Sequence, residues 1–133
     1  MKNKQKGSNA ERELLFALFN KGFAVSRVAG SGSSQLPTPD ILGFRAGKAL
    51  AIECKTKKGE YLNIREEQVE ELILWEKLSG LKAYIAWRLG KDQWYFIGIS
   101  GLKKTKKAYS IKRAEIQEKG LIFEKFISEF ESK

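Results

Sequence analysis

The sequence predicts a single α/β domain in which a mixed β-sheet is flanked by helices. The chain has 133 residues, a length that supports one domain and would leave two half-size domains marginal. Hydrophobic residues make up 42% of it, enough to fill a core. Helix-like and strand-like patterns follow one another in the order α-β-β-β-α-β-β-α. This order requires a mixed sheet with helices packed against it.

The first half of the chain predicts one helix followed by three short strands. Ser8 to Glu11 forms a capping-box pattern, so we expect a helix from Ser8 to about Lys21, ended by Gly22. Pro39 cannot donate to a β-ladder and marks the start of a strand. Strands are expected at 23–28, 40–44 and 49–55, with a small-residue loop at 29–37 and a turn at 45–48.

The second half predicts a helix, a β-hairpin and a last helix. Apolar residues at helical spacing indicate a helix from Ile64 to Leu78. Alternating segments at 81–89 and 94–99 indicate a hairpin, and a basic linker follows it. An apolar stripe formed by Phe123, Phe126, Ile127 and Phe130 predicts a helix near 122–130. We expect residues 1–133 to form one domain, with a basic N-terminal arm over about 1–7 and a C-terminal extension over about 101–133.

The charge balance predicts a polyanionic partner. The chain has 25 Lys+Arg against 16 Asp+Glu, a formal net charge of +9, and a pI of about 9.7. Nucleic acid fits this balance best, with an acidic membrane surface second. A solvated surface explains any single lysine, but clusters favour contact with a phosphate backbone. The clusters are Lys2, Lys4 and Lys6; Lys55, Lys57 and Lys58; and Lys103, Lys104, Lys106, Lys107, Lys112 and Arg113.

Several functional classes are excluded by what the sequence lacks. There is no histidine, which removes imidazole-based catalysis and zinc sites that need imidazole. No apolar run approaches the length of a membrane span, and the basic N-terminus lacks the apolar core of a secretory signal. The single cysteine cannot form an internal disulfide, so a cytoplasmic protein without membrane contact is expected.

Two carboxylate residues, Asp40 and Glu53, occur in predicted apolar strands, where turn chemistry does not explain them. Asp92 lies in a hairpin loop, where turn chemistry explains it, but Asp40 lies at the head of an apolar strand. In the next strand, side chains alternate between faces, so Glu53 and Lys55 point to one face and Cys54 to the other. Cys54 is most simply a buried, inert thiol.

A carboxylate pair on adjacent strands, with a lysine beside it, suits metal-dependent phosphodiester hydrolysis. Mg²⁺ prefers oxygen ligands, and two carboxylates with a backbone carbonyl suffice to hold it. The lysine can orient the attacking water or stabilise the transition state. A surface ion pair between Glu53 and Lys55 is the ordinary alternative, but the upstream Pro39–Asp40 dipeptide favours the functional interpretation.

Three further features fit the same chemistry. Glu11 lies on the core-facing stripe of the first helix, where burying a carboxylate costs free energy unless a cation or a hydrogen-bond donor contacts it. The capping box is the alternative explanation for this glutamate. Arg27 can clamp a phosphate with two hydrogen bonds. The loop with Gly30, Ser31 and Ser33 is rich in backbone donors. It lacks the Lys-Ser/Thr ending of a nucleotide-binding loop, so no nucleotide cofactor is expected.

Together these residues resemble a known nuclease superfamily. Pro39-Asp40 followed by Glu53-Cys54-Lys55 is similar to the motif of the restriction-endonuclease-like nucleases. Within that superfamily, the chain resembles the archaeal-type Holliday junction resolvases at residues 7–13, at Gly22-Phe-Ala-Val, at Arg27 and in the Gly30-Ser31-Gly-Ser loop. This resemblance runs from about Lys6 to Leu89.

The resemblance implies a restriction-endonuclease-like core and a Mg²⁺-dependent endonuclease that resolves four-way DNA junctions by paired, symmetric incisions. Mn²⁺ is expected to substitute for Mg²⁺. Matching catalytic residues are Glu11, Ser31, Asp40, Glu53 and Lys55, and the metal ligands implied are Asp40, Glu53, Glu11 and the backbone carbonyl of Cys54. Arg12 and Arg27 match residues that contact DNA or support the site. The serine loop and the lysine clusters add Ser31, Ser33, Lys57, Lys58, Lys103, Lys104, Lys106 and Lys107 as DNA contacts.

Paired incision of a junction predicts a homodimer, because one active site per particle cuts one strand. Candidates for its interface are the apolar residues Phe123, Phe126, Ile127 and Phe130, with Trp94 and Phe96; core packing is the alternative for each. Two other functions stay open at this point. One is a related nuclease acting on other branched or duplex DNA, and the other is a basic DNA-binding protein without catalysis.

Overall fold

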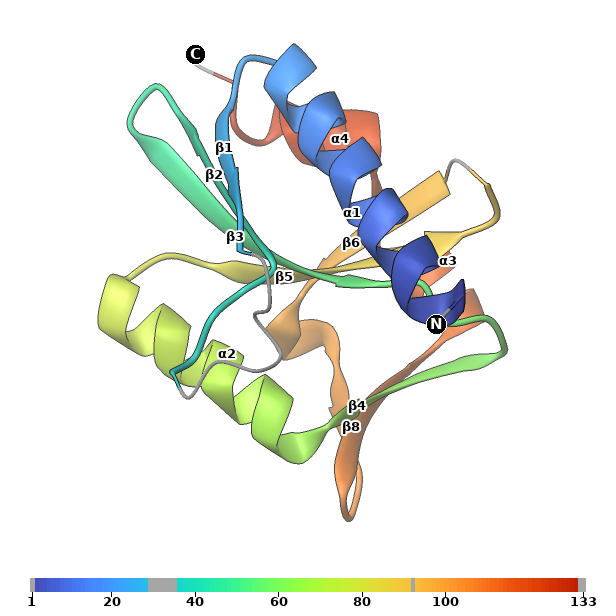
Figure 1. The fold of residues 1–133 in the computed structure, drawn as a ribbon. Coiled ribbons are helices and arrows are strands. Elements are labelled where there is room, and N and C mark those ends of the chain that lie inside the picture. Colours follow the sequence, from blue (N-terminus) through green and yellow to red (C-terminus); the bar gives the residue numbers. More distant parts are fainter. Residues whose placement is uncertain (1, 29–35, 92, 132–133) are drawn as a thin grey trace.

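The structure, a computed structural model, describes residues 2–28, 36–91 and 93–131. Its centre is a six-stranded mixed sheet in the order β1-β2-β3-β5-β6-β9, shown in Figure 1. The strands β3 and β5 are parallel, and the other neighbours are antiparallel. The strands are β1 (Ala24–Arg27), β2 (Ile41–Arg45), β3 (Lys48–Lys55), β5 (Ala83–Leu89), β6 (Gln93–Gly98) and β9 (Leu121–Ile122).

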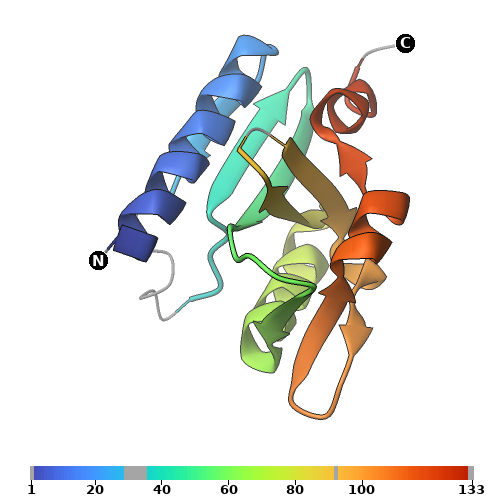
Figure 2. The same ribbon diagram turned by 90° about the vertical axis from the view of Figure 1, so that its right-hand side faces the viewer.

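A second, three-stranded sheet lies beside α2 in the order β4-β8-β7 (Figure 2). Its members are β4 (Tyr61–Arg65), β7 (Lys103–Lys104) and β8 (Ala108–Lys112). The helices are α1 (Lys2–Asn20), α2 (Glu66–Ser79), α3 (Arg113–Lys119) and α4 (Phe123–Ser128), with a 3-10 turn at Ile99–Gly101. None of the helices in the described part of the chain is long and apolar enough to cross a membrane.

The central sheet separates two hydrophobic cores. One core packs Leu14 and Leu18 of α1 and Phe126 of α4 against the strand residues Ile52 and Phe96. The other packs α2, α3 and the small sheet on the opposite face; its residues include Val69, Leu72, Ile85, Trp87, Ile111 and Ile116. The alternation along β3 follows the sequence expectation, since Ile52 and Cys54 belong to the first core and Ala51 to the second.

Two helix starts predicted from the sequence are wrong. Helix α1 begins at Lys2, so Ser8 and Glu11 lie inside the helix and not at its start, and residues 2–7 belong to the same helix. The predicted start of the second helix at Ile64 is also displaced, because Ile64 belongs to β4 and α2 begins at Glu66. Pairing of β4 with β8, which follows 43 or more residues later, decides this boundary, and local periodicity carries no sign of it.

The expected basic linker after β6 is folded. Residues 103–112 form the β7–β8 hairpin, and β8 pairs with β4 from Tyr61↔Lys112 to Arg65↔Ala108. Helix α3 follows at Arg113. Because Ile111 and Ile116 are buried in one core and Phe126 and Phe130 in the other, the last third is an integral part of the fold.

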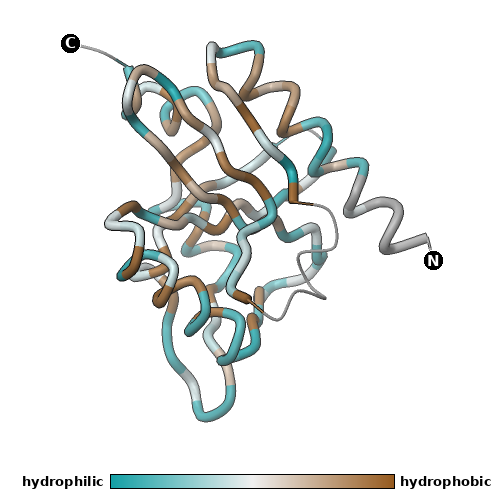
Figure 3. The backbone as a smooth tube through the Cα atoms, turned by 60° about the vertical axis from the view of Figure 1, so that its left-hand side comes forward, coloured by the Kyte–Doolittle hydropathy of each residue, from teal (hydrophilic) through white to brown (hydrophobic). Residues whose placement is uncertain are grey.

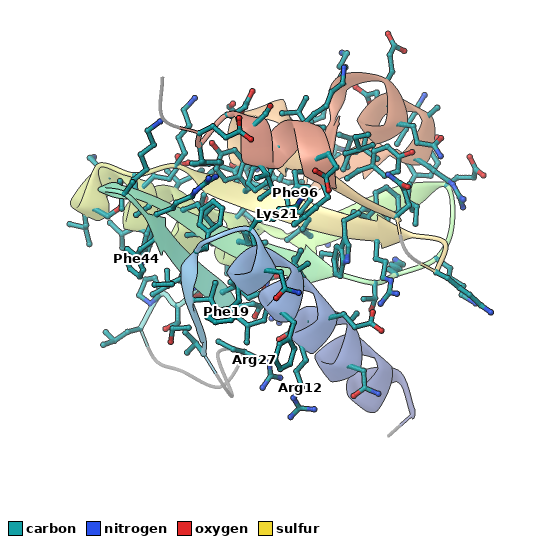
Figure 4. All side chains as sticks on the ribbon, turned by 90° about the horizontal axis from the view of Figure 1, so that it is seen from above. Arg12, Phe19, Lys21, Arg27, Phe44 and Phe96 are labelled. Carbon is teal, nitrogen blue, oxygen red and sulfur yellow. The ribbon has the colours of Figure 1, made fainter. Side chains whose placement is uncertain are left out.

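The apolar residues expected at a dimer interface are largely internal. Trp94, Phe96, Phe126, Ile127 and Phe130 are all buried. The rings of Phe96 and Phe126 stack with their centroids 4.1 Å apart, and Figure 4 shows Phe96 beneath the C-terminal helices. Core packing therefore accounts for these five residues, and Phe123, the sixth candidate, is partly buried against the same core.

Candidate active site

The β2–β3 register brings two acidic residues of the predicted site together. Ile41 pairs with Ile52, so Asp40, one residue earlier, comes opposite Glu53. The Asp40 Oδ2 atom accepts a hydrogen bond from the backbone amide of Cys54 at 2.9 Å. The carbonyl oxygen of Asp40 accepts another from the amide of Val28 at 2.9 Å. The side chain and the backbone of Asp40 are thus both fixed by hydrogen bonds just before β2 begins.

Both carboxylates are buried. Asp40 is 8% exposed and Glu53 is 5% exposed, and they are the two buried charged residues of the described chain. Burial first, and then the negative charge of Asp40, raise the pKa of Glu53 from 4.5 to about 8, against an opposing effect of Lys55. The pair therefore forms an electrostatically strained acidic site that a cation would relieve.

Lys55 and a residue that the sequence analysis missed complete this cluster. The Lys55 Nζ atom lies 3.8 Å from Glu53 Oε2 and donates a hydrogen bond to Gln68 Oε1 at 2.9 Å. The Gln68 Nε2 atom donates in turn to Glu53 Oε2. Gln68 is the third residue of α2. The one sign of it in the sequence is that a neutral amide interrupts the acidic run 66–71.

Glu11 lies near the acidic pair but is engaged by an arginine. Arg27 Nε donates to Glu11 Oε1 at 3.1 Å, and this pair links α1 to β1. Burial first, and then the charge of Asp40, raise the pKa of Glu11, while Arg27 opposes the shift. Glu11 is therefore within electrostatic reach of Asp40, as expected for a residue that supports the site. Figure 4 shows Arg12 and Arg27 extending at the same edge of the molecule, outside α1 and β1.

Comparisons with known proteins agree with this geometry. A family model described as archaeal Holliday junction resolvase (Hjc) matches residues 2–133. The chain belongs to this family. The crossover junction endodeoxyribonuclease Hjc of Archaeoglobus fulgidus is 40% identical over 108 residues, covering 81% of this chain and 79% of that protein. Its namesake from Sulfolobus acidocaldarius is 33% identical over 135 residues, covering 100% of this chain and 94% of that protein.

A solved structure confirms the predicted fold. The 1.6 Å structure of Archaeoglobus fulgidus Hjc, described as a Holliday junction resolvase, superposes with a TM-score of 0.82 at 35% identity. The match covers 92% of this chain and 99% of the other. The resemblance inferred from Pro39-Asp40 and Glu53-Cys54-Lys55 is therefore confirmed, and so is the restriction-endonuclease-like core with its mixed sheet.

The acidic site of this resolvase-family chain suits a hard divalent cation. Nucleases of this family are metal-dependent. Asp40 and Glu53 offer carboxylate oxygens side by side, and burial together with the charge of Asp40 raises the pKa of Glu53 to about 8 despite the nearby Lys55. Within residues 2–28, 36–91 and 93–131, no group of three or more His, Cys, Asp or Glu side chains is arranged to hold a metal. Two carboxylates with a backbone carbonyl fit Mg²⁺, which keeps several of its waters.

The basic residues expected to contact DNA in the resolvase occupy different settings. Arg12 is exposed, whereas Arg27 is partly buried against Glu11. Lys57 and Lys58 are exposed in the loop that leaves β3. The carbonyl oxygen of Lys57 accepts a hydrogen bond from Trp87 Nε1 at 2.7 Å, which anchors that loop to the core.

Beside this loop, a hollow of about 370 Å³ is lined by cationic side chains. It is formed by Ala10, Thr56, Lys58, Arg88, Gly90 and Lys91. Arg88 is held by Glu13 at 2.6 Å and lies over the ring of Trp94. Arg88 and Lys91 were not predicted as part of the site, because they come from the far end of the β5–β6 hairpin, distant in sequence from the carboxylates.

The lysines of 103–107 lie on the β7–β8 hairpin, and all four are exposed. Figure 3 shows this hairpin as a hydrophilic projection. Lys104 forms an ion pair with Glu66, the first residue of α2, and so is not a free cation. The hairpin is thereby fixed beside the helix that carries Gln68. Ser31 and Ser33, both predicted site residues, lie outside the residues that the structure describes.

The buried carboxyl group of Glu53 predicts a pH dependence of stability in the metal-free protein. Its pKa is 4.5 in the unfolded chain and about 8 in the folded one, so between these values the folded state holds an extra proton. This group's stabilisation is complete below pH 4.5 and falls as pH rises, with a slope of at most about 1.4 kcal/mol per pH unit. We expect the Glu53→Gln variant to lack the contribution of this group to the pH dependence of the free energy of unfolding.

Urea unfolding at pH 5.5 and pH 8 in EDTA measures this effect. The wild type should lose more free energy of unfolding between the two pH values than Glu53→Gln does. Glu118→Gln, an exposed carboxylate of α3, is the matched control and should follow the wild type. Equal slopes in the wild type and Glu53→Gln would contradict the assignment of the raised pKa.

Proposed function

We propose that this protein is a Mg²⁺-dependent endonuclease that resolves four-way DNA junctions by paired, symmetric incisions, with Mn²⁺ able to replace Mg²⁺. The observation that carries the proposal is the buried Asp40–Glu53 pair with Lys55 beside it, in a chain of the Holliday junction resolvase family. A DNA-binding protein without catalysis would have no need to maintain two strained carboxylates at one site. The basic loop, hollow and hairpin around the site supply the electrostatic attraction for DNA.

The proposed mechanism gives each residue of the site a distinct role. Asp40, Glu53 and the Cys54 carbonyl would hold the cation. Bound there, Mg²⁺ would lower the pKa of a water and neutralise charge on the phosphate. Lys55 orients the attacking water and stabilises the negative charge that develops on the phosphate oxygens. Glu11, held by Arg27, supports the acidic site from α1, and Ser31 is proposed from the sequence to help hold the phosphate.

The cytoplasm is the proposed location, and residues 1–133 are proposed to act as one nuclease domain. The single cysteine, Cys54, is buried and free. Its burial raises the pKa of its thiol and makes it unreactive. A unified domain is supported by the first core, which combines Leu14 near the start of the chain with Phe126 near its end.

We infer a homodimer in which α2 of one copy packs against α2 of another. Helix α2 exposes Ile73 and Leu74, each 43% exposed, and Leu78, 78% exposed, more large apolar side chains than any other described element. Cutting two symmetry-related strands requires two active sites, so a second copy of this chain is the occupant that suits this face. Since Gln68 at the start of α2 borders the active site, this packing would link the two sites through rigid helices.

Cleavage of labelled oligonucleotides tests the function. A four-way junction, a fork and a linear duplex with the same arm sequences are incubated with the protein in Mg²⁺ or EDTA. We expect cutting of the junction in Mg²⁺ alone, with the duplex left intact. Preferred cutting of the fork or equal cutting of duplex would indicate a related nuclease with another substrate. Junction binding without cutting would indicate a non-catalytic protein.

The β7–β8 hairpin is predicted to follow a DNA arm. Its cations Lys103, Lys106 and Lys107 are exposed and project beside α2, whereas Lys104 is paired with Glu66. Replacing these three lysines by Gln should weaken junction binding and lower the slope of log K against log salt by about 0.9 for each lost phosphate contact.

Gel-shift titrations between low and moderate salt measure that slope. The matched control replaces three exposed lysines elsewhere, Lys48, Lys82 and Lys125, by Gln. The control loses the same net charge but keeps the hairpin. If both triple variants lose the same slope, the hairpin lysines contribute only to overall charge.

A further inference from the structure

Gln68 connects two residues of the proposed active site that carry opposite charges. Its Oε1 atom accepts a hydrogen bond from Lys55 Nζ at 2.9 Å. Its Nε2 atom donates to Glu53 Oε2. Lys55 sets the orientation of the amide, because an ammonium group only donates and must therefore face the amide oxygen. Both ends of this side chain are therefore used inside the site.

The amide changes how Lys55 and Glu53 meet. Their charged atoms lie 3.8 Å apart, longer than a direct charge-assisted hydrogen bond of about 2.7–2.9 Å. Without a partner between them, the ammonium group would close onto the carboxylate as an ordinary ion pair. In that contact the ammonium group would be engaged directly by Glu53, which would compete with its proposed action on water and phosphate.

The fold holds Gln68 firmly in this place. The next residue, Val69, is fully buried in the core beneath α2, and Leu72 follows it one turn later. The first residue of the helix, Glu66, is fixed by its ion pair with Lys104 of the β7–β8 hairpin. The side chain of Gln68 thus projects into the site from a helix held by the core through Val69 and Leu72 and by the β7–β8 hairpin through Glu66.

We propose that Gln68 is a positioning residue that holds the Lys55 ammonium and the Glu53 carboxylate apart and in catalytic orientation. This inference rests on the proposed nuclease function and assigns to α2 a part in that reaction. Gln68 acts through Lys55 and Glu53, so its loss should slow the chemical step and leave junction binding unchanged. Removing a residue that orients a ligand in this way commonly costs 10–100-fold in activity or metal affinity.

Single-turnover cleavage of a four-way junction tests the proposal. Gln68→Met keeps the length and volume of the side chain but loses both hydrogen bonds. We expect a cleavage rate about 10–100-fold below wild type at saturating enzyme and saturating Mg²⁺, with a junction Kd within about twofold and an unchanged Tm. Gln117→Met, on the exposed face of α3, is the matched control and should cut at the wild-type rate.

A second variant separates the two ends of the amide. Gln68→Glu keeps an acceptor for Lys55 but places a carboxylate against Glu53, so it should be about as slow as Gln68→Met. Wild-type cutting by either variant would overturn the proposal. A raised junction Kd with an unchanged rate at saturation would also overturn it, because Gln68 would then contact DNA instead.

The metal-free protein provides a readout that does not depend on cleavage. The side-chain amide resonances of Gln68 in a ¹⁵N spectrum should lie apart from those of exposed Gln93 and Gln117. Glu53→Ala should move them toward the exposed group, and the absence of such a shift would contradict the Glu53 contact. A wild-type protein that cuts no DNA would refute the proposed function, whereas normal cutting by Gln68→Met would refute only this inference.

Discussion

Replacing Asp40 by Asn, or Glu53 by Gln, abolishes junction cleavage and leaves junction binding intact. We expect a rate loss of more than about 1000-fold, since the cation supplies several kcal/mol of transition-state stabilisation and each tenfold corresponds to about 1.4 kcal/mol. Both side chains are buried and fixed by neighbours, so the amide variants preserve the shape of the site. Removing a negative charge near phosphate should keep affinity equal to wild type or improve it.

Cutting and gel-shift binding measured in parallel check this result. Glu118→Gln on α3 removes the same charge far from the site and should retain full activity. Near-wild-type turnover in Mg²⁺ by Asp40→Asn would remove Asp40 from the metal site, and the same holds for Glu53→Gln. A parallel loss of binding and cutting would indicate a folding defect, which the Tm of each variant would detect.

We expect that charging the exposed face of α2 converts the proposed dimer into a monomer that nicks junctions. Leu74→Lys combined with Leu78→Lys places two cations where a second copy is proposed to pack, and burying them would cost several kcal/mol each. Both leucines are exposed at 43% and 78%, so a single chain should keep its fold. Without a partner, the two incisions on one junction become independent events.

Light scattering and a junction-nicking assay measure the two consequences. Phe16→Lys combined with Phe19→Lys is the matched control, because these residues of α1 are also exposed, at 66% and 63%. The control should remain a dimer and make paired cuts. If the α1 variant dissociates and the α2 variant does not, the interface lies on α1; if neither dissociates, the charged α2 face is not an interface.

The acidic site was predictable because local rules determine it. Glu53 and Lys55 lie in one strand, where alternation places them on one face, and a short hairpin sets the register that brings Asp40 opposite Glu53. Non-local contacts were not predictable in this way. The sequence predicted a linker where the β7–β8 hairpin lies, because its pairing partner β4 is distant in the chain. For the same reason, the predicted start of α2 included a residue that belongs to β4.

Two kinds of residue needed the folded structure. Gln68 looks like an ordinary polar residue near the start of a helix, and its role appears once α2 is packed beside Lys55 and Glu53. Phe126 and Phe130 form an apolar stripe that fits a core and an interface equally well, and their burial against Phe23, Tyr84 and Phe96 decides for the core. Periodicity reports which face is apolar but does not report what covers it.

Cleavage of a supercoiled plasmid that extrudes a cruciform tests the central claim most directly. Paired incision across the junction converts the plasmid to a linear product, whereas a single cut gives an open circle. With Mg²⁺, the wild-type protein should give linear product from the cruciform plasmid, none from a plasmid without the inverted repeat, and none from either in EDTA. Cutting of both plasmids at equal rates, or cutting that persists in EDTA, would contradict a metal-dependent junction resolvase.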